Sequence, residues 1–424
     1  MKYIVKLNKV YEWLIGFSLL FLVFFYDLTS NFLGFFDEFL ALIFFIVIIY
    51  KTAFSKKIYL YKSEIIIFNL LLVTVFLGLL SNYMSYRNGK VTDFNAIIGD
   101  FINFYKVFIV YFGIRLINTS FNSKTVLNMV SKYSEKFFYI VLFLLILDVF
   151  LKIFPQAPRY GIHSYQLFFA HPSRYSFIFA FVFLILFYKY NKRNNLFLLF
   201  ILVLGLTSLR VKYFGFAFIS FSLIYLKSFL LKIPKKTIYI VLALFIISMT
   251  YLFRDQIDMY FSLDQINAGW SRGIVLVTSF KIGNDYFPLG TGFGSYSSYF
   301  SGKYYSWVYD KYNINNVYGI SRLYWGFVAD QFWPMVLAQF GYFGLVAYIA
   351  IIYKYISMFI TFFKDKLSSI TNKNLMIASL LGMLLLLIDS TSDAIFTQNR
   401  AVALFIFFAL IFNLQDQLKK TTNI

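Results

Sequence analysis

The stretch EIIIFNLLLVTVFLGLLS, residues 64–81, decides the fold class because almost all of it is apolar. As a helix rising about 1.5 Å per residue, it is long enough to cross most of the roughly 30 Å hydrocarbon layer of a bilayer. Similar windows recur along the 424 residues, of which 60% are hydrophobic and 23% aromatic. A soluble domain cannot bury that much apolar surface, so the sequence predicts an all-α integral membrane protein.

Twelve transmembrane helices are expected, and they divide the chain into three parts. Residues 1–253 would hold the first nine helices, residues 254–330 a large extracytoplasmic loop, and residues 331–424 the last three helices and a cytoplasmic C-terminus. The first apolar stretch carries Glu12 and has no small-residue cleavage site, so it is expected to be a retained helix. The expected spans are residues 10–28, 32–50, 64–81, 101–117, 137–154, 175–190, 196–209, 213–231, 237–253, 331–353, 374–389 and 401–414.

The lysines predict how these helices are oriented. The net charge of +20 includes many lysines that concentrate in alternate connections and near both termini. The positive-inside rule places those segments, and therefore both termini, in the cytoplasm. We interpret this pattern as membrane topology and expect no nucleic-acid partner. Cysteine is absent, which excludes disulfides and thiolate metal sites.

The arginines have the opposite distribution. All except Arg115 and Arg193 fall in connections that the lysines assign to the outside. Some would anchor helix ends at lipid headgroups, but a planar guanidinium also binds phosphate or carboxylate oxygens through paired hydrogen bonds. This concentration favours an anionic ligand on the outer face. The residues concerned are Arg87, Arg159, Arg174, Arg210, Arg254, Arg272, Arg322 and Arg400.

The loop at residues 254–330 is long, only moderately polar, and rich in tyrosine and tryptophan. We expect short helices that pack on the outer mouth of the bundle and form a cap over a cavity. Interfacial aromatic belts explain part of this composition. Flat rings with a hydroxyl edge also suit sugars, which present C–H faces and hydroxyl rims.

Three segments contain candidate site residues. Arg272 precedes the sequence PLGTGFG, residues 288–294, whose glycines alone favour a tight turn, the alternative being a loop whose backbone closely approaches a ligand. Asp330 stands just before the tenth span, where it would be catalytic or would cap the helix. Arg210 lies between two closely spaced spans, where it would bind a ligand or extend to lipid headgroups.

The two histidines belong to one outer loop, and each lies near an arginine. For His163 and His171 the leading interpretation is polar packing, an acid–base role is the alternative, and a metal site is not expected. In the last outer loop, Asp389 and Asp393 are expected to form ion pairs with Arg400.

The interior of the spans is expected to be almost free of charge. Lys106 and Asp148 are the exceptions that the sequence places near apolar segments, and both are expected to sit at helix ends. A bundle without deep charges favours an enzyme over a transporter of charged molecules.

Together these segments resemble the O-antigen polymerase and ligase superfamily, membrane glycosyltransferases that use polyprenyl-diphosphate-linked glycans. The resemblance covers most of the chain in topology, and it implies a GT-C-like helix bundle. Its motifs are loose. They are matched by Arg272 with residues 288–294, by the Leu-Thr-x-x-Arg pattern from Leu206 to Arg210, in part by Arg159 with Gly161, and by Asp330-Gln331 followed by Gly341 and Gly344.

One departure separates the subfamilies. Ligases of this superfamily carry a His-Asn pair where this chain has Asp330-Gln331, and residues 254–330 contain no histidine. The resemblance therefore implies a polymerase of the Wzy kind in the cell inner membrane, acting in O-antigen or capsule biosynthesis. The alternatives are a flippase for the same lipid-linked glycans, or a ligase if a histidine from the loop containing His163 and His171 reaches the site.

The resemblance also implies roles for individual residues. Asp330 would be the general base for the acceptor hydroxyl, while Arg210 and Arg272 stabilise the departing diphosphate without a metal or cofactor. The expected partners are undecaprenyl-diphosphate-linked donor and acceptor glycans, the bilayer, a chain-length regulator and a flippase. Residues expected to bind the diphosphate or glycan are Arg159, Arg254, Arg322, Gly290, Gly292, Gly294 and Tyr296.

Overall fold

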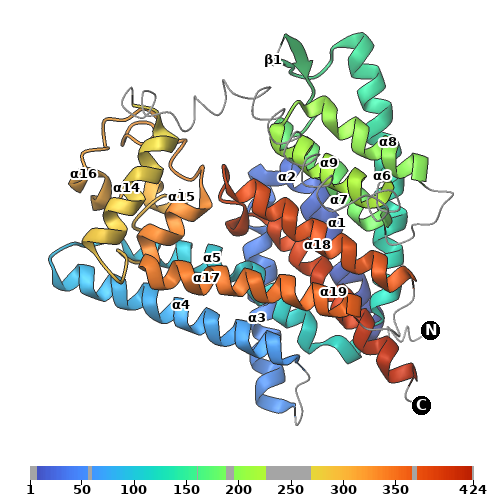
Figure 1. Ribbon diagram of the computed structural model, residues 1–424, viewed down its shortest axis with the longest axis horizontal. Helices are drawn as coiled ribbons and strands as arrows, with labels where there is room; N and C mark the ends of the chain where they lie inside the picture. The colour runs from blue at the N-terminus through green and yellow to red at the C-terminus, as the bar shows by residue number, and fades with distance from the viewer. Residues whose placement is uncertain are drawn as a thin grey trace, which may run out of the picture.

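The computed structural model of the chain describes residues 7–55, 60–159, 161–187, 195–225, 269–364 and 370–422. Within these ranges the chain is helical, apart from one short β-hairpin (Figure 1). The expected span at 237–253 and the first part of the large loop, including Arg254, lie outside the described residues.

Apolar helices dominate the structure, which supports the prediction of a multi-pass membrane protein. Five segments are long and apolar enough to cross a membrane, and shorter apolar helices accompany them, so twelve full-length spans are not reproduced among the described residues. The first expected span, residues 10–28, is shorter than the observed segment Asn8–Leu33, and the second, residues 32–50, is displaced by four residues from the helix at Phe36–Phe54. The long segments are Asn8–Leu33, Lys62–Arg87, Phe94–Leu116, Phe332–Thr361 and Asn399–Gln417.

The first part of the bundle consists of long helices joined by short turns. Helix α1 (Leu7–Leu20) continues through a π-helical segment (Phe21–Phe25) into α2 (Tyr26–Leu33). The helices that follow are α3 (Phe36–Phe54), α4 (Lys62–Arg87), α5 (Phe94–Leu116) and α6 (Ser123–Leu151). Asp148 lies at the end of α6 as predicted, where its Oδ1 accepts a hydrogen bond of 2.8 Å from the Phe154 amide.

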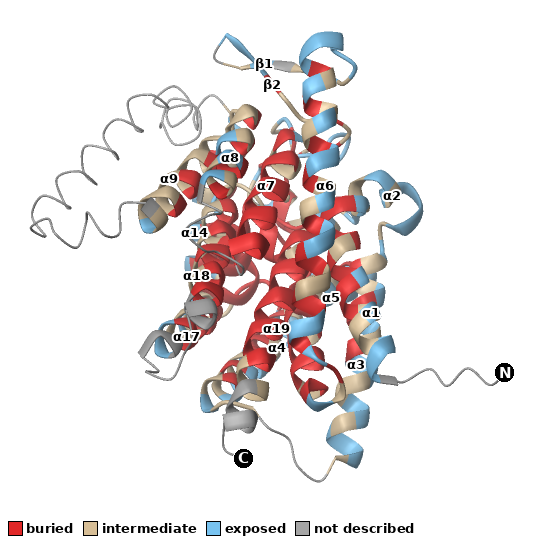
Figure 2. Cartoon of the chain, turned by 90° about the vertical axis from the view of Figure 1, so that its right-hand side faces the viewer, coloured by how far each residue is buried: buried red, intermediate tan, exposed pale blue. Residues whose placement is uncertain are grey.

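A β-hairpin and three shorter helices form the middle of the chain. Strands β1 (Ala157–Arg159) and β2 (Ile162–Ser164) pair in antiparallel fashion. The helices are α7 (Pro172–Phe187), α8 (Asn195–Gly205) and α9 (Val211–Tyr225), with a 3-10 turn (Leu206–Ser208) after α8. Helix α7 is buried from Tyr175 to its end at Phe187 (Figure 2), because other helices surround it.

Residues 269–331, which we call the cap, contain three helices beside the bundle (Figure 1). They are α14 (Ser271–Asp285), α15 (Tyr299–Lys303) and α16 (Trp307–Lys311). The cap has a small hydrophobic core of its own, which includes Val275, Tyr296 and Tyr309. It packs against the membrane helices through α14 on α17 and through α15 on α5.

The last three helices are α17 (Phe332–Lys364), α18 (Ile370–Ser390) and α19 (Asn399–Thr422). Gly341 breaks α17, because its φ of 66° and ψ of −169° are not helical. The cap supplies partners for the interrupted backbone: the amides of Thr291 and Gly292 donate to the carbonyls of Ala338 and Gln339, each over 2.9 Å. A break in a helix leaves carbonyls without helical partners, so these bonds stabilise both the kink and the attached cap.

The expectation of almost uncharged spans is wrong. Lys106 lies in the middle of α5, not at a helix end, and its Nζ is 2.6 Å from both Asp37 Oδ2 and Glu38 Oε1 of α3. Arg115 is also buried, near the end of α5. These two cations are tolerated inside the bundle because each has a carboxylate close by.

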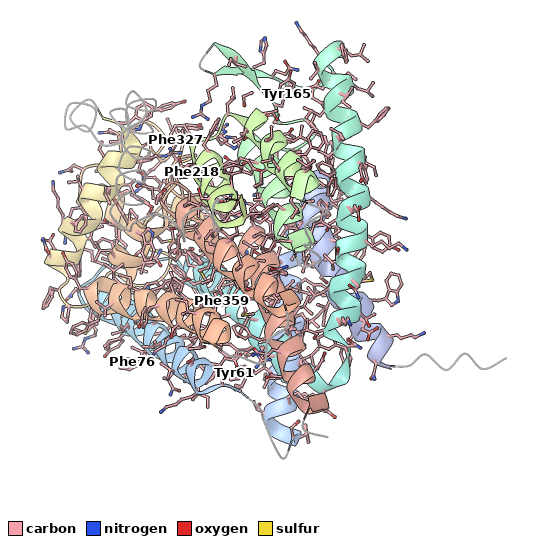
Figure 3. The ribbon with its side chains drawn as sticks, turned by 45° about the vertical axis from the view of Figure 1, so that its right-hand side comes forward. Tyr61, Phe76, Tyr165, Phe218, Phe327 and Phe359 are labelled. Carbon is pink, nitrogen blue, oxygen red and sulfur yellow. The ribbon has the colours of Figure 1, made fainter. Side chains whose placement is uncertain are left out.

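Arg115 organises a second polar group, which we call the Arg115 cluster. It lies at the end of the bundle opposite the cap, because α4 and α5 contact the cap through their other ends. In Figure 3, Tyr61 marks the end with the cluster and Phe327 marks the cap. Arg115 Nε is 2.6 Å from Glu64 Oε1 and its Nη1 is 2.8 Å from Asp416 Oδ2. The members of the cluster are Tyr61, Glu64, Tyr111, Arg115, Asn413 and Asp416.

Candidate functional site

Charged residues from several helix termini gather beside the cap. Helices α7, α9, α14, α17 and α19 begin at this end of the bundle and α18 ends there. Each contributes a polar residue at the point where its apolar sequence stops, since a charge is costly further inside. We call this group the cap-end cluster. Its members are Asp27, His171, Arg174, Arg210, Lys212, Arg272, Asp330, Asp389, Asp393 and Arg400.

The predicted residues Arg272 and Asp330 contact each other directly. Arg272 lies in the first turn of α14 and donates from Nε (3.0 Å) and Nη2 (2.8 Å) to Oδ2 of Asp330, which directly precedes α17. Both side chains are partly accessible, at 22% and 27% of their full exposure. Burial raises the pKa of Asp330, and Arg272 opposes this effect without cancelling it. A carboxylate with a raised pKa is a better proton acceptor than an ordinary one.

Arg210 contacts a histidine. Its Nη2 lies 3.1 Å from Nε2 of His171, which connects the start of α9 with the start of α7. The Ser173 amide lies 3.2 Å from the other ring nitrogen. Partial burial, followed by the charges of Arg210 and Arg400, lowers the pKa of His171 to about 4. The imidazole is therefore neutral at pH 7, and one of the two histidines reaches the cluster.

The last loop contributes the ion pairs that the sequence predicted. Arg400 is paired with Asp393 and its Nη1 lies 3.7 Å from Asp389 Oδ2, which confirms the expected pairing. Burial raises the pKa of Asp393, but Arg400 and Lys212 lower it by more, so Asp393 stays ionised. Lys212 in turn lies 3.5 Å from Asp389 Oδ1.

Two residues connect the Arg272–Asp330 pair with the Arg210–His171 pair. Lys212 and Asp393 act electrostatically on the pKa of both His171 and Asp330, so the two pairs belong to one charged region. Lys212 was missed by the sequence analysis, although it offered a signal: it is a lysine on the side of the membrane assigned to the arginines, two residues after Arg210.

Arg174 completes the cluster on the side of α2 and α19. Its Nη1 donates to Asn399 Oδ1 over 2.7 Å and lies 3.4 Å from Asp27 Oδ1. With the imidazole neutral, the ten members of the cluster comprise five cations and four carboxylates. Their sum is one positive charge, so the region attracts anions even though its ion pairs are largely matched.

The other predicted arginines have different surroundings. Arg322 pairs with Asp310 over 2.6 Å and lies above the Tyr305 ring at 4.7 Å, all within the cap. Arg159 is part of β1. The hairpin is attached near Arg210, because Ser164 Oγ donates to the Ser208 carbonyl over 3.0 Å. Arg254 lies outside the described residues.

The glycines of the PLGTGFG sequence lie inside the protein. A Cβ atom would come within 2.3 Å of the Ala338 carbonyl oxygen at Gly290, 2.4 Å of Asn82 at Gly292, and 2.6 Å of Ala96 at Gly294. These contacts support the turn that the residues alone favour, and not the ligand role that the resemblance implies, since protein atoms already occupy the space that a ligand would need. The side chain of Tyr296 is also buried, and its hydroxyl donates to the Val275 carbonyl over 2.9 Å.

Polar residues of α4, α5 and α17 hold this turn in place, and sequence analysis did not find them. Asn82 forms two hydrogen bonds with the backbone of Phe293, accepting over 2.8 Å and donating over 3.0 Å. Asp100 Oδ2 accepts from the Gly294 amide over 2.9 Å and from Gln339 Nε2 over 2.8 Å. A carboxylate within an apolar span was the available signal, because such a residue requires a polar partner.

Comparison with known proteins adds no assignment. No protein-family model, curated protein or solved structure matches this chain. Functional reasoning therefore depends on the residues and their geometry.

Proposed function

We propose that this chain is a membrane-embedded polysaccharide polymerase. It would transfer a growing glycan from polyprenyl diphosphate to the terminal hydroxyl of a lipid-linked repeat unit, on the outer face of the cell inner membrane. The observation that supports this best is the Arg272–Asp330 pair, with its two contacts of 3.0 and 2.8 Å, beside the cationic remainder of the cap-end cluster. Such chemistry needs a proton acceptor and fixed positive charge close together.

The proposed reaction is one displacement at the anomeric carbon of the donor. Asp330 takes the proton of the acceptor hydroxyl, whose oxygen forms the new glycosidic bond, and the bond from the anomeric carbon to the diphosphate breaks. Arg210 and Arg272 stabilise the negative charge that the leaving diphosphate acquires. Lys212 is a third cation for the same charge, since it acts on both pairs of the cluster.

A ligase for the same lipid-linked glycans is the second candidate. It is favoured by His171, which lies 3.1 Å from Arg210 and is neutral at pH 7. A neutral imidazole next to a cation that holds diphosphate could also accept a proton from an acceptor hydroxyl. The two enzymes differ in the acceptor that receives the glycan.

A flippase is the third candidate. The sequence argued against it because the spans were expected to be almost free of charge, and the structure weakens that argument. The spans do contain buried charges, such as Lys106 in the middle of α5 with Asp37 of α3. Each buried cation, however, contacts a carboxylate of the same bundle, so these groups contribute little net charge for a moving diphosphate.

The deciding experiment is the surface-glycan ladder of cells that lack this protein, compared with the same cells carrying the gene on a plasmid. A polymerase predicts loss of long chains, with single repeat units still attached to the core. Undecorated core, together with lipid-linked polymer accumulating on the outer face, would indicate a ligase. Single lipid-linked units retained on the cytoplasmic face would indicate a flippase and would overturn the roles given to Asp330 and the arginines.

A further inference from the structure

The cap exposes a group of aromatic side chains close to Asp330. Tyr318 and Tyr324 are 71% and 43% exposed, and Leu323 between them is fully exposed. The two tyrosine rings lie 5.0 Å apart, and both contact Phe327 at centroid distances of 5.8 and 5.7 Å. Large rings at the surface of a folded segment cost hydrophobic free energy, so their exposure calls for a partner.

The segment that carries these rings is fixed in one conformation. The Phe327 amide donates to the Gly319 carbonyl over 3.0 Å, which closes a loop around residues 320–326. Tyr305 Oη donates to the carbonyl of Ile320 over 2.9 Å, and the buried side chain of Ile320 anchors the base of the loop. Rings held in advance lose little conformational entropy when a ligand binds.

The loop that carries the rings leads into Asp330, because both tyrosine rings contact Phe327 and Asp330 follows Phe327 by three residues. Val328 is buried, and Asp330 follows it by two residues, so the chain leads directly from the rings to the pair. The surrounding protein, then Tyr318 and, to a smaller extent, Asp330 raise the pKa of the Tyr324 hydroxyl. Ser321 lies next to the rings, since its hydroxyl bonds with the backbone of Tyr324, and Arg322 of the same loop is 64% exposed while it pairs with Asp310.

A lipid headgroup is the competing partner for exposed tyrosines. Tyrosines of a headgroup belt have no reason to lie beside a carboxylate that itself pairs with an arginine. A sugar does fit this arrangement: its C–H face stacks on a ring, and its hydroxyls bind to a carboxylate, a guanidinium and tyrosine hydroxyls. Because Asp330 is the proposed proton acceptor, the sugar next to it is the one whose hydroxyl reacts.

We infer that Tyr318 and Tyr324 form a stacking subsite for the terminal sugar of the acceptor glycan. The inference rests on the proposed function. It adds a binding site for an uncharged carbohydrate next to the cationic site for diphosphate, so donor and acceptor are recognised by different chemistry.

The test uses an acceptor mimic that has no diphosphate. The probe is the free oligosaccharide repeat unit, released by mild acid from the lipid carrier of cells that lack this protein. It is titrated into the purified full chain in lipid nanodiscs, and calorimetry measures Kd. The double variant Tyr318→Leu/Tyr324→Leu, which keeps apolar packing against Phe327 but removes the flat rings, should bind about tenfold more weakly.

Two further variants make the test specific. Tyr324→Phe keeps the ring and should bind within about twofold of wild type, because stacking and not the hydroxyl supplies most of the affinity. Tyr299→Ala is the matched control: it removes another half-exposed cap tyrosine, whose ring contacts are with Phe300 and Trp325, and it should not change Kd. Thermal midpoints of all variants establish that the cap is folded.

Unchanged binding in the double leucine variant would overturn the inference, and so would equal losses in the double variant and in Tyr299→Ala. Failure of the proposed function looks different. If the deletion strain shows the glycan ladder expected for a flippase or a ligase, the proposed polymerase reaction is overturned, whatever the Kd values of the tyrosine variants. A polymerase ladder combined with unchanged Kd would leave the reaction and remove only the sugar subsite.

Discussion

The Arg115 cluster and the cap-end cluster both contain arginine–carboxylate pairs, at opposite ends of the bundle. Arg115 is 1% exposed and Glu64 is not exposed at all, and the guanidinium donates to Glu64, Asn413 and Asp416. Arg272 and Asp330 also form a close pair, but both side chains remain about a quarter exposed. One arginine is enclosed by protein on every side, and the other has a side that faces outward.

This difference in enclosure predicts different functions. A buried ion pair that loses one member leaves an unpaired charge, at a cost of about 3–5 kcal/mol. An accessible pair contributes about 0–1 kcal/mol and can exchange its partner for a ligand. We therefore expect the Arg115 cluster to hold α4, α5 and α19 together and the cap-end cluster to carry out chemistry.

The largest effect is expected from Arg115→Ala. Glu64 and Asp416 would be left as unpaired carboxylates, so the free energy of unfolding should fall by about 3–5 kcal/mol. The measurement is the yield and thermal midpoint of the detergent-purified protein. Arg87→Ala, at an exposed position at the end of α4, is the control and should be close to wild type. A stable Arg115→Ala protein would contradict the structural role.

The Asp330→Asn variant should have the opposite outcome to Arg115→Ala: loss of activity without loss of stability. Removing the proposed base should lower the rate of glycan transfer by about 10²–10⁴-fold, while yield and thermal midpoint stay near wild type. Complementation of the deletion strain, read as the glycan ladder, measures the effect. Asp285→Asn is the control, because this exposed cap carboxylate pairs with the Tyr312 hydroxyl. Retained long chains in Asp330→Asn would exclude it as the base.

Gly292→Ala tests the attachment of the cap, which brings Arg272 and Asp330 together. Gly292 has a φ of 92° and no room for a Cβ, whereas Gly89 has a φ of 70° and open space around it. Gly89→Ala should cost about 1–2 kcal/mol for the left-handed backbone alone, and Gly292→Ala should cost more. Thermal midpoints compare the two variants. Equal costs would mean that the turn is not packed as described.

Arg272→Lys should have a smaller effect than loss of the base. Lysine keeps the charge but cannot make the paired contacts to Asp330 Oδ2, so we expect roughly tenfold slower transfer without loss of stability. The rate of transfer by the purified variant is the measurement. Full activity would show that a point charge is sufficient and would remove the argument from guanidinium geometry.

The smallest effect is a shift in pH dependence. Because burial raises the pKa of Asp330, the rate should fall on acidification at a pH above the usual aspartate value of about 3.9. The stability of the folded protein depends on pH in the opposite sense to the rate. Because the folded state favours protonated Asp330, this contribution to stability is present at low pH and is lost as the pH rises through the raised pKa. His171, whose pKa is lowered to about 4, is neutral until the pH approaches that value. A rate that is constant down to pH 4 would contradict the assignment.

The sequence predicted those features that depend on neighbouring residues. Apolar runs located most helices, and polar residues at their ends located Arg210, Arg272 and Asp330. It did not predict pairings between distant helices, such as Arg115 with Asp416 or Lys106 with Asp37, because hydropathy contains no information about which helix lies beside which. For the same reason Asp100 was missed. The PLGTGFG glycines favoured a turn, as observed, but the resemblance assigned them to a ligand, whereas their close neighbours are α4, α5 and α17.

The kink at Gly341 also has a mechanical consequence. The segment Phe332–Phe340 is bonded to the cap through the carbonyls of Ala338 and Gln339, while the rest of α17 runs along α4. If glycan binding shifts the cap, that first segment must travel with it and bend at Gly341. Arg272 and Asp330 would then move as one unit, and their separation from Arg210 and His171 would be the distance that changes.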